Sequence, residues 1–160
     1  MLGYKCFNEN LTNRYNTKFE IGKIYHVNGN IKFGNNGNGF HICKNLEDTL
    51  RYFNSFDYNI SICLVYAFGK YDKYNDEYYG FYDMYAYEYL TILKKLNREE
   101  IINYALNLNE IRIQRFLSLY KLSNEEIKLF KNKFNNFESI IKCISYYQEN
   151  NKDVYKILKK

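Results

Sequence analysis

The chain has 160 residues, a formal net charge of +5 and a sequence pI of about 8.8. This length suits one domain with a sizeable core, and the charge falls short of the dense basic stripe typical of nucleic-acid-binding domains. The four cysteines are too far apart in sequence to suggest a zinc site, so we expect no metal site. The first residues form no apolar leader and no run of 18 apolar residues occurs, so we expect a cytoplasmic protein without a membrane span.

The two halves of the chain differ in texture. All eight glycines lie in residues 1–80, whereas apolar residues recur with the helical period after residue 96. We therefore expect an α+β fold in a single domain, with a sheet-rich part over residues 1–96 and a helical part over residues 97–160. The sheet should be small and mostly antiparallel, with about four to six strands and one helix.

The first strands are expected to be short. Tyr4–Phe7 is one candidate, and Phe19–Val27 is a second whose apolar residues share one face. Asn28–Asn30 reads as a tight turn that joins it to Ile31–Phe33 in a hairpin. The glycine-rich segment Gly34–Gly39 follows, either as a loose connector or as a loop whose N–H groups cradle a phosphate.

The strongest strand signal is Ile60–Phe68, which is apolar or small on both faces and should lie in the interior of the sheet. Before it, Gly39–Cys43 suits a short strand, and Asn45 is placed to cap a helix over Leu46–Asn54. These elements would surround the strongest strand with the rest of the sheet-rich part.

The tyrosine-rich stretch Tyr71–Tyr82 is polar and should form a loop. Tyr85–Lys95 then carries aromatic and β-branched residues typical of a last strand. A helix is the alternative there, because Leu90, Leu93 and Leu96 are spaced by three. After residue 96, four or five short helices are expected, with a lysine-rich polar surface for which solvation or a weak RNA or membrane-surface contact are the alternatives.

Two helix starts carry capping boxes. Asn97 is followed three residues later by Glu100, and Ser123 by Glu126. In such a box, each side chain satisfies a backbone N–H of the other residue. The sequence thus predicts helices that begin directly after Asn97 and Ser123.

Five short motifs follow one another in the sheet-rich part: Gly3–Asn8, Phe19–Tyr25, Gly39–Cys43 with Asn45, Asp48, and Val65–Gly69. In this order they resemble a small family of unknown function from phages, bacteria and giant viruses. The resemblance spans residues 3–95. It implies a compact α+β domain and brings no known reaction.

A second resemblance is to ADP-ribosyltransferases. Gly39–Ile42 followed by Asn45–Tyr52 has the order and spacing of their Gly-x-Tyr-Phe segment and the helix that follows it. The resemblance implies NAD as cofactor, with His41 and Glu88 as the catalytic candidates. The chain departs from the family pattern, because His41 stands in place of a nicotinamide-stacking Tyr and Tyr4–Cys6 lacks the His-Gly or Arg-Gly pair.

The residues themselves offer few catalytic groups. His41 lies between two apolar residues, so it should face a groove or solvent, either as a general acid or base or as a structural donor to a backbone carbonyl. His26, beside the expected turn, should be exposed and inert. Cys43 beside Lys44 is either a nucleophile of lowered pKa with His41 as its partner, or a structural thiol.

Eleven tyrosines lie between residues 52 and 89, and acidic residues match the basic ones among them. A protein-contact surface that includes Tyr78, Tyr79 and Tyr82 is therefore favoured over a nucleic-acid surface. With no complete catalytic set, we expect a non-catalytic interaction module that needs no cofactor, in one form a viral or phage accessory protein in the host cytoplasm. The alternative is an ADP-ribosyltransferase-like enzyme that uses NAD.

Overall fold

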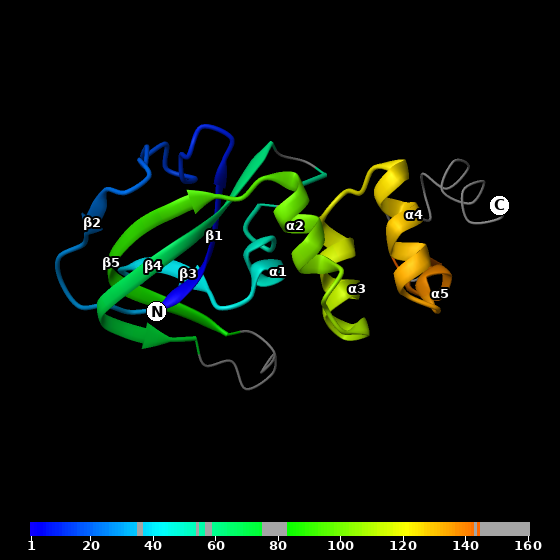
Figure 1. Ribbon diagram of the computed structural model, residues 1–160. Coiled ribbons are helices and arrows are strands. Elements are labelled where there is room, and N and C mark those ends of the chain that lie inside the picture. Colours follow the sequence, from blue (N-terminus) through cyan, green and yellow to red (C-terminus); the bar gives the residue numbers. More distant parts are fainter. Residues whose placement is uncertain (35–36, 54, 57–58, 75–82, 143, 145–160) are drawn as a thin grey trace. The chain divides into compact units, whose positions relative to one another are not determined.

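The computed structural model describes residues 1–34, 37–53, 55–56, 59–74, 83–142 and 144. It has five strands and one short helix first and the other helices last (Figure 1), which confirms the α+β expectation. The chain divides into two compact units, residues 1–96 and residues 97–160. The first unit holds β1 (Leu2–Asn8), β2 (Ile24–His26), β3 (Phe40–Cys43), α1 (Leu46–Thr49), β4 (Ile60–Lys73) and β5 (Met84–Lys95).

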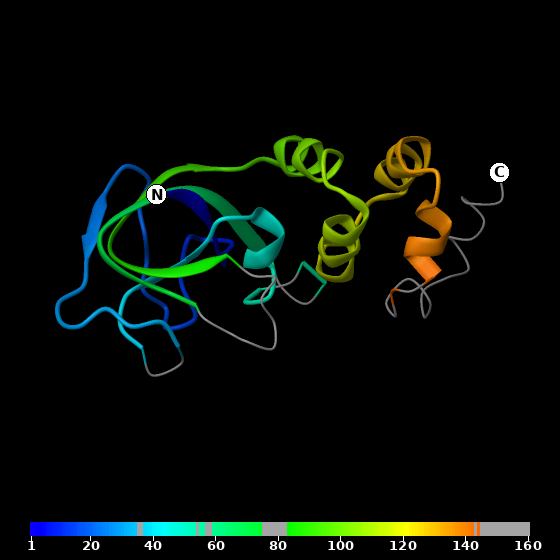
Figure 2. The same cartoon turned by 90° about the horizontal axis from the view of Figure 1, so that it is seen from below.

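The five strands form an antiparallel sheet that closes into a small barrel. β4 pairs with β1 on one side and with β5 on the other, and β5 also pairs with β3. The ring closes where Tyr4 of β1 faces Cys43 of β3. Figure 2 shows how strongly β4 and β5 curve to make this closure. The prediction that Ile60–Phe68 is an interior strand is confirmed, since it forms the first part of β4.

The expected hairpin between Phe19–Val27 and Ile31–Phe33 is wrong. β2 pairs instead with β5, where Tyr25 faces Leu90. The reason is burial, because the Tyr25 ring packs on Phe19, with ring centroids 4.6 Å apart, and both join the apolar core around Leu90. This long-range packing outweighs the local turn, as expected for a register set by a buried face.

The helix expected over Leu46–Asn54 is much shorter, since α1 ends at Thr49. The Asn45 side chain makes no capping bond to the backbone, and its amide nitrogen donates to the Asp48 carboxylate over 3.0 Å instead. The Asn45 side chain thus acts as a donor to Asp48, and the capping role predicted for it is wrong.

The expected tyrosine-rich loop begins later than predicted. Tyr71 to Lys73 belong to β4, which continues past an irregularity at Gly69, where φ is +84°. Residues 75–82 lie outside the described residues. The last strand is confirmed as β5 and the helix alternative is wrong, because the burial alternates from Ile92, which is buried, to Leu93, which is 44% exposed.

An apolar cluster fills the barrel unit. Its members come from all the strands except β2 and from the loop before β2, so the core depends on contacts between segments far apart in sequence. The fully included residues are Phe7, Phe19, Ile42, Cys63, Val65, Ala67, Tyr87, Leu90 and Ile92.

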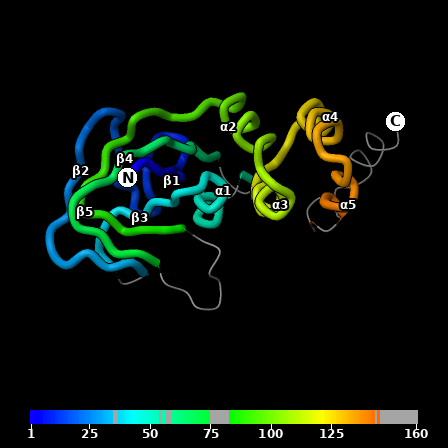
Figure 3. The backbone as a smooth tube through the Cα atoms, turned by 60° about the horizontal axis from the view of Figure 1, so that its bottom comes forward, coloured from blue at the N-terminus to red at the C-terminus, as the bar shows by residue number. Residues whose placement is uncertain are grey.

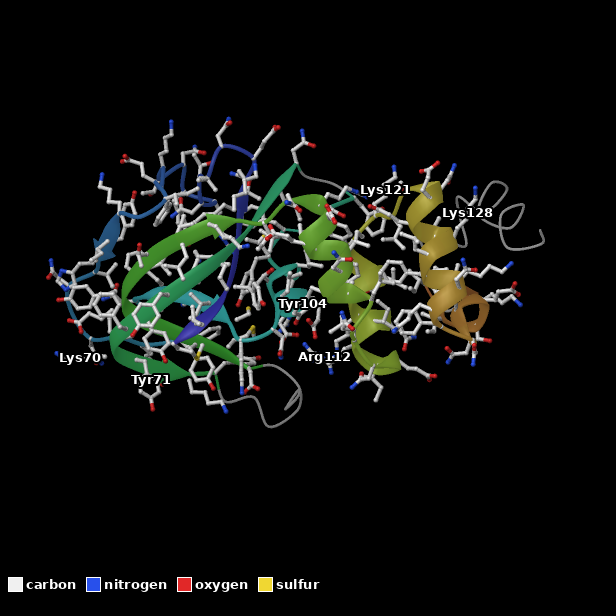
Figure 4. All side chains as sticks on the ribbon, in the orientation of Figure 1. Lys70, Tyr71, Tyr104, Arg112, Lys121 and Lys128 are labelled. Atoms are coloured by element: carbon white, nitrogen blue, oxygen red, sulfur yellow. The ribbon has the colours of Figure 1, made fainter. Side chains whose placement is uncertain are left out.

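The second unit is helical, as predicted, and both capping boxes are confirmed at Asn97 and Ser123. Arg112 donates to the Tyr104 hydroxyl over 2.8 Å and so joins two neighbouring helices (Figure 4). In the described parts of the chain, no helix is both long and apolar enough to cross a membrane. The helices are α2 (Arg98–Ala105), α3 (Glu110–Leu119), α4 (Asn124–Lys133) and α5 (Phe137–Lys142).

Candidate functional site

The candidate site lies where the barrel is closed most weakly. Among the described residues, β1 and β3 share one pair of facing residues, Tyr4 and Cys43. The two strands can be followed beside each other in Figure 3. Next to this pair, a side chain links the two strands, because the Lys5 ammonium on β1 donates a hydrogen bond to the His41 carbonyl on β3 over 2.7 Å. We call this junction of β1 and β3 the seam.

A cavity of about 500 Å³ opens at the seam. The strands supply its floor, and two loops border it, one over residues 13–17 and one that includes Phe33 and Gly39. Aromatic side chains make up much of its wall. The phenylalanines and tyrosines that line it are Tyr4, Tyr15, Phe19, Tyr25, Phe33, Phe40, Tyr52 and Phe53.

Lys5 is the most unusual group in this wall. Its side chain is partly buried, and its ammonium lies 5.6 Å from the centre of the Phe7 ring. Among the described residues, no carboxylate pairs with it. Burial lowers the pKa of Lys5 to about 8, and the positive charge of Arg14 acts in the same direction. At neutral pH the Lys5 ammonium is therefore still mostly charged, although its burial removes part of the water that would stabilise this charge.

His41 lines the same cavity. Its ring stacks on Phe33, with centroids 4.4 Å apart, and the Phe33 N–H is fixed by the Asp72 carboxylate over 2.8 Å. The Nε2 atom of His41 is buried and has no hydrogen-bond partner among the described residues. Burial, followed by the charges of Lys5 and Arg14, lowers the pKa of His41 to about 4, so the ring is neutral at physiological pH.

Arg14 and Tyr52 border the mouth of the cavity. Arg14 is exposed, and its guanidinium lies 5.8 Å from the centre of the Tyr52 ring. No carboxylate of the described residues pairs with Arg14. Burial raises the pKa of Tyr52 to about 12, so its hydroxyl stays protonated. The cavity thus holds two cations and neutral hydrogen-bonding groups, and none of the described residues that line it is acidic.

The two catalytic candidates from the sequence do not line one cavity. His41 lines it, whereas Glu88 does not. The Glu88 carboxylate accepts from the Lys70 N–H over 3.0 Å and lies 3.5 Å from Nε2 of His26, which does reach the cavity. The Lys70 N–H, followed by His26, holds the pKa of Glu88 below its ordinary value. His26 is exposed, as expected, and stacks on Tyr89.

The nucleophile expectation for Cys43 is wrong. Burial, followed by the nearby Asp48, raises the pKa of the Cys43 thiol, the opposite of what a thiolate nucleophile needs. In the glycine-rich loop, the Gly37 N–H donates to the Gly34 carbonyl over 3.0 Å, so it is not free to bind a phosphate.

The expected tyrosine contact surface is only partly in view. Tyr78, Tyr79 and Tyr82 lie outside the described residues. Tyr71, at the described edge of that stretch, is 62% exposed and stacks on Tyr87 (Figure 4). The described residues contain no group of three or more His, Cys, Asp or Glu side chains that could hold a metal ion.

Sequence reasoning missed the two cations of the cavity. Lys5 left a signal, because it is the one charged residue in the expected strand Tyr4–Phe7. A lysine inside a short apolar strand is rarely buried without a partner. The sequence around Arg14 gives no such signal, since nothing in this polar loop indicates that it borders a cavity at the seam.

Replacing His41 by phenylalanine should make the free energy of unfolding depend less on pH below about 6.5. The variant keeps a ring beside Phe33 but cannot titrate. A lowered pKa means that the unfolded chain binds the proton more tightly, so the wild type loses stability as the pH falls from 6.5 to about 4. We expect this loss to exceed that of the variant by about 1–2 kcal/mol, after allowance for solvent screening. Urea unfolding at several pH values measures it, and parallel profiles would contradict it.

Comparison with known protein families gives a match over the first part of the chain. A family model described as "Domain of unknown function (DUF7666)" covers residues 1–104, which include the whole barrel and its cavity. No curated protein and no solved structure matches the chain.

Proposed function

The chain belongs to the DUF7666 family, a family of unknown function, and we propose from the chemistry of its cavity that the barrel is a non-catalytic module that binds a small organic anion. The ligand would enter between the two bordering loops and place its negative group beside Lys5 and Arg14. The aromatic wall would contact the rest of the ligand.

One observation carries this proposal. Lys5 and Arg14 both line the cavity, and no carboxylate among the described residues pairs with either of them. Lys5 is partly taken out of water without a counter-charge, which is costly, so an anion that supplies this counter-charge recovers part of that cost, and the exposed Arg14 adds a further attraction at the mouth.

The size and the walls of the cavity narrow the class of ligand. A volume of about 500 Å³ falls in the usual range for small-molecule pockets. Aromatic rings such as Phe33 and Phe40 favour a flat, partly apolar body over a bare inorganic ion. An aromatic carboxylate or an aromatic phosphate ester combines both features.

Titration calorimetry with terephthalate, a flat aromatic dianion, tests the proposal. We expect saturable binding to the wild type, weaker at high salt, and no binding of the neutral terephthalamide. Replacing Arg14 by methionine should weaken the binding about threefold to fivefold, because the guanidinium is exposed and its charge is screened. Replacing Lys18, a cation that directly follows this loop and does not line the cavity, by methionine should leave the affinity unchanged.

Two results would overturn the proposal. One is the absence of saturable binding to the wild type at millimolar terephthalate. The other is an equal loss of affinity in the Arg14→Met and Lys18→Met variants, which would indicate attraction by net charge alone. NAD, the cofactor of the enzyme alternative with His41 and Glu88, carries two phosphates and two aromatic rings, so the same titration followed by a check for nicotinamide release tests that alternative.

A further inference from the structure

We propose that Lys5 is a covalent attachment point that forms a reversible imine with a small aldehyde or ketone bearing an anionic group. This inference rests on the proposed function, because the anion site is what brings the carbonyl group to the amine. It narrows the ligand class from organic anions in general to those that also carry a reactive carbonyl.

The position of the amine supports this chemistry. Lys5 projects from β1 at the seam into the wall of a cavity large enough for a ligand. Its one hydrogen bond among the described residues goes to the His41 carbonyl, which fixes the nitrogen in place and leaves its other positions available. No described carboxylate pairs with Lys5. A salt bridge would hold the nitrogen in its unreactive, protonated form.

The environment also makes free amine available near neutral pH. A pKa of about 8 leaves roughly one molecule in ten with an unprotonated Lys5 at pH 7, about 300-fold more than at the ordinary lysine value. Lys23 shows the contrast, because its hydrogen bond to Glu20 raises its pKa. Desolvated lysines are the usual imine-forming residues in proteins.

The step needs no further reactant. The lone pair of Nζ attacks the carbonyl carbon, a C–N bond forms, and the proton of the amine moves to the oxygen. That oxygen then leaves as water with a second proton from the nitrogen, and the C=N bond remains. Hydrolysis reverses the sequence. The imine nitrogen can take up a proton again, which restores a positive charge beside the anionic group of the ligand.

Trapping with 4-carboxybenzaldehyde and sodium cyanoborohydride at pH 7.5 tests the inference on the full chain. The reductant turns the imine into a stable secondary amine, which peptide mass mapping locates. We expect Lys5 to be labelled at least about tenfold faster than any other lysine, given its larger fraction of free amine. Benzaldehyde, which lacks the carboxylate, should label it more slowly, and terephthalate should slow the labelling by competition.

Variants and outcomes separate this inference from the proposed function. Lys5→Met should abolish the fast adduct, and Lys23→Met should retain it. If terephthalate binds the wild type but Lys5 is labelled no faster than other lysines, the imine is overturned and the anion module stands. If terephthalate does not bind and Lys5 is not labelled preferentially, both fall. Fast labelling by both aldehydes alike, without competition by terephthalate, would overturn the requirement for an anionic ligand.

Discussion

Replacement of Lys5 by methionine is expected to weaken terephthalate binding about tenfold to a hundredfold without destabilising the free protein. Hydrogen bonds to a charged partner are worth about 1.5–3 kcal/mol, and about 1.4 kcal/mol corresponds to a tenfold change in affinity. Methionine has a similar length and fills the same place beside Phe7, but it carries no charge that burial would penalise. Calorimetry and urea unfolding on the same sample measure both effects.

The pH dependence sharpens this prediction. Wild-type affinity for the dianion should fall as the pH rises through about 8, where Lys5 loses its proton, and the variant should lack this fall. The folding stability of the wild type should instead increase as the pH rises above 8. Because the pKa of Lys5 is lowered by folding, the charged form costs stability below pH 8, and the cost is relieved between pH 8 and 10.5. The advantage of the variant, about 1 kcal/mol after loss of the bond to His41, should therefore shrink above pH 8.

Lys18→Met is the matched control, since it removes the same charge from the surface beside the cavity. It should change neither the affinity nor its pH dependence. A Lys5→Met variant that binds terephthalate as tightly as the wild type would show that Lys5 does not contact the anion.

Replacement of Gly3 by valine is expected to cost about 3 kcal/mol of folding free energy and to open the seam. A Cβ atom at position 3 would lie 2.7 Å from the Cys43 carbonyl oxygen and 3.3 Å from a side-chain atom of Ile42. The first obstacle is backbone, so β1 and β3 must separate to make room. Overpacking of this kind usually costs about 1–3 kcal/mol, and the loss of strand pairing adds to it.

The measurement is urea unfolding of the full chain. Leu2→Val, at the neighbouring exposed position of the same strand, is the control and should stay within about 0.5 kcal/mol of the wild type. Because Lys5 reaches the His41 carbonyl only while the strands stay close, Gly3→Val should also weaken terephthalate binding. A variant as stable as the wild type would show that the close approach at Gly3 does not hold the seam.

Local patterns predicted much of this fold. The β4 and β5 segments were recognisable because their apolar residues meet the needs of strands, and Ser123 with Glu126 marks a helix start through bonds within one turn. In each case the signal and the structure it predicts lie in the same short segment. The failures concern partners far away, as when Tyr25 meets Leu90 across 65 residues instead of its neighbours after the turn.

The site was harder to predict for the same reason. His41 was identified from its chemistry, but its environment depends on Phe33 and Lys5, which reach it from other elements. Glu88 was chosen to complete a family pattern, and its carboxylate is engaged by Lys70 and His26. That Lys5 lines a cavity without a carboxylate partner among the described residues depends on segments brought together by the barrel. The residues next to Lys5 in the sequence therefore cannot predict it.

Both β2 and β3 occupy the same side of β5, one facing its second half and the other its first. The chain leaves that side at Val27, whose N–H donates to the Glu88 carbonyl, and returns to it at Phe40. The stretch between is held by β5 at both ends, so its exposed described residues can be exchanged without shifting any strand. Such exchanges would change the rim of the cavity while leaving the barrel that holds it unchanged.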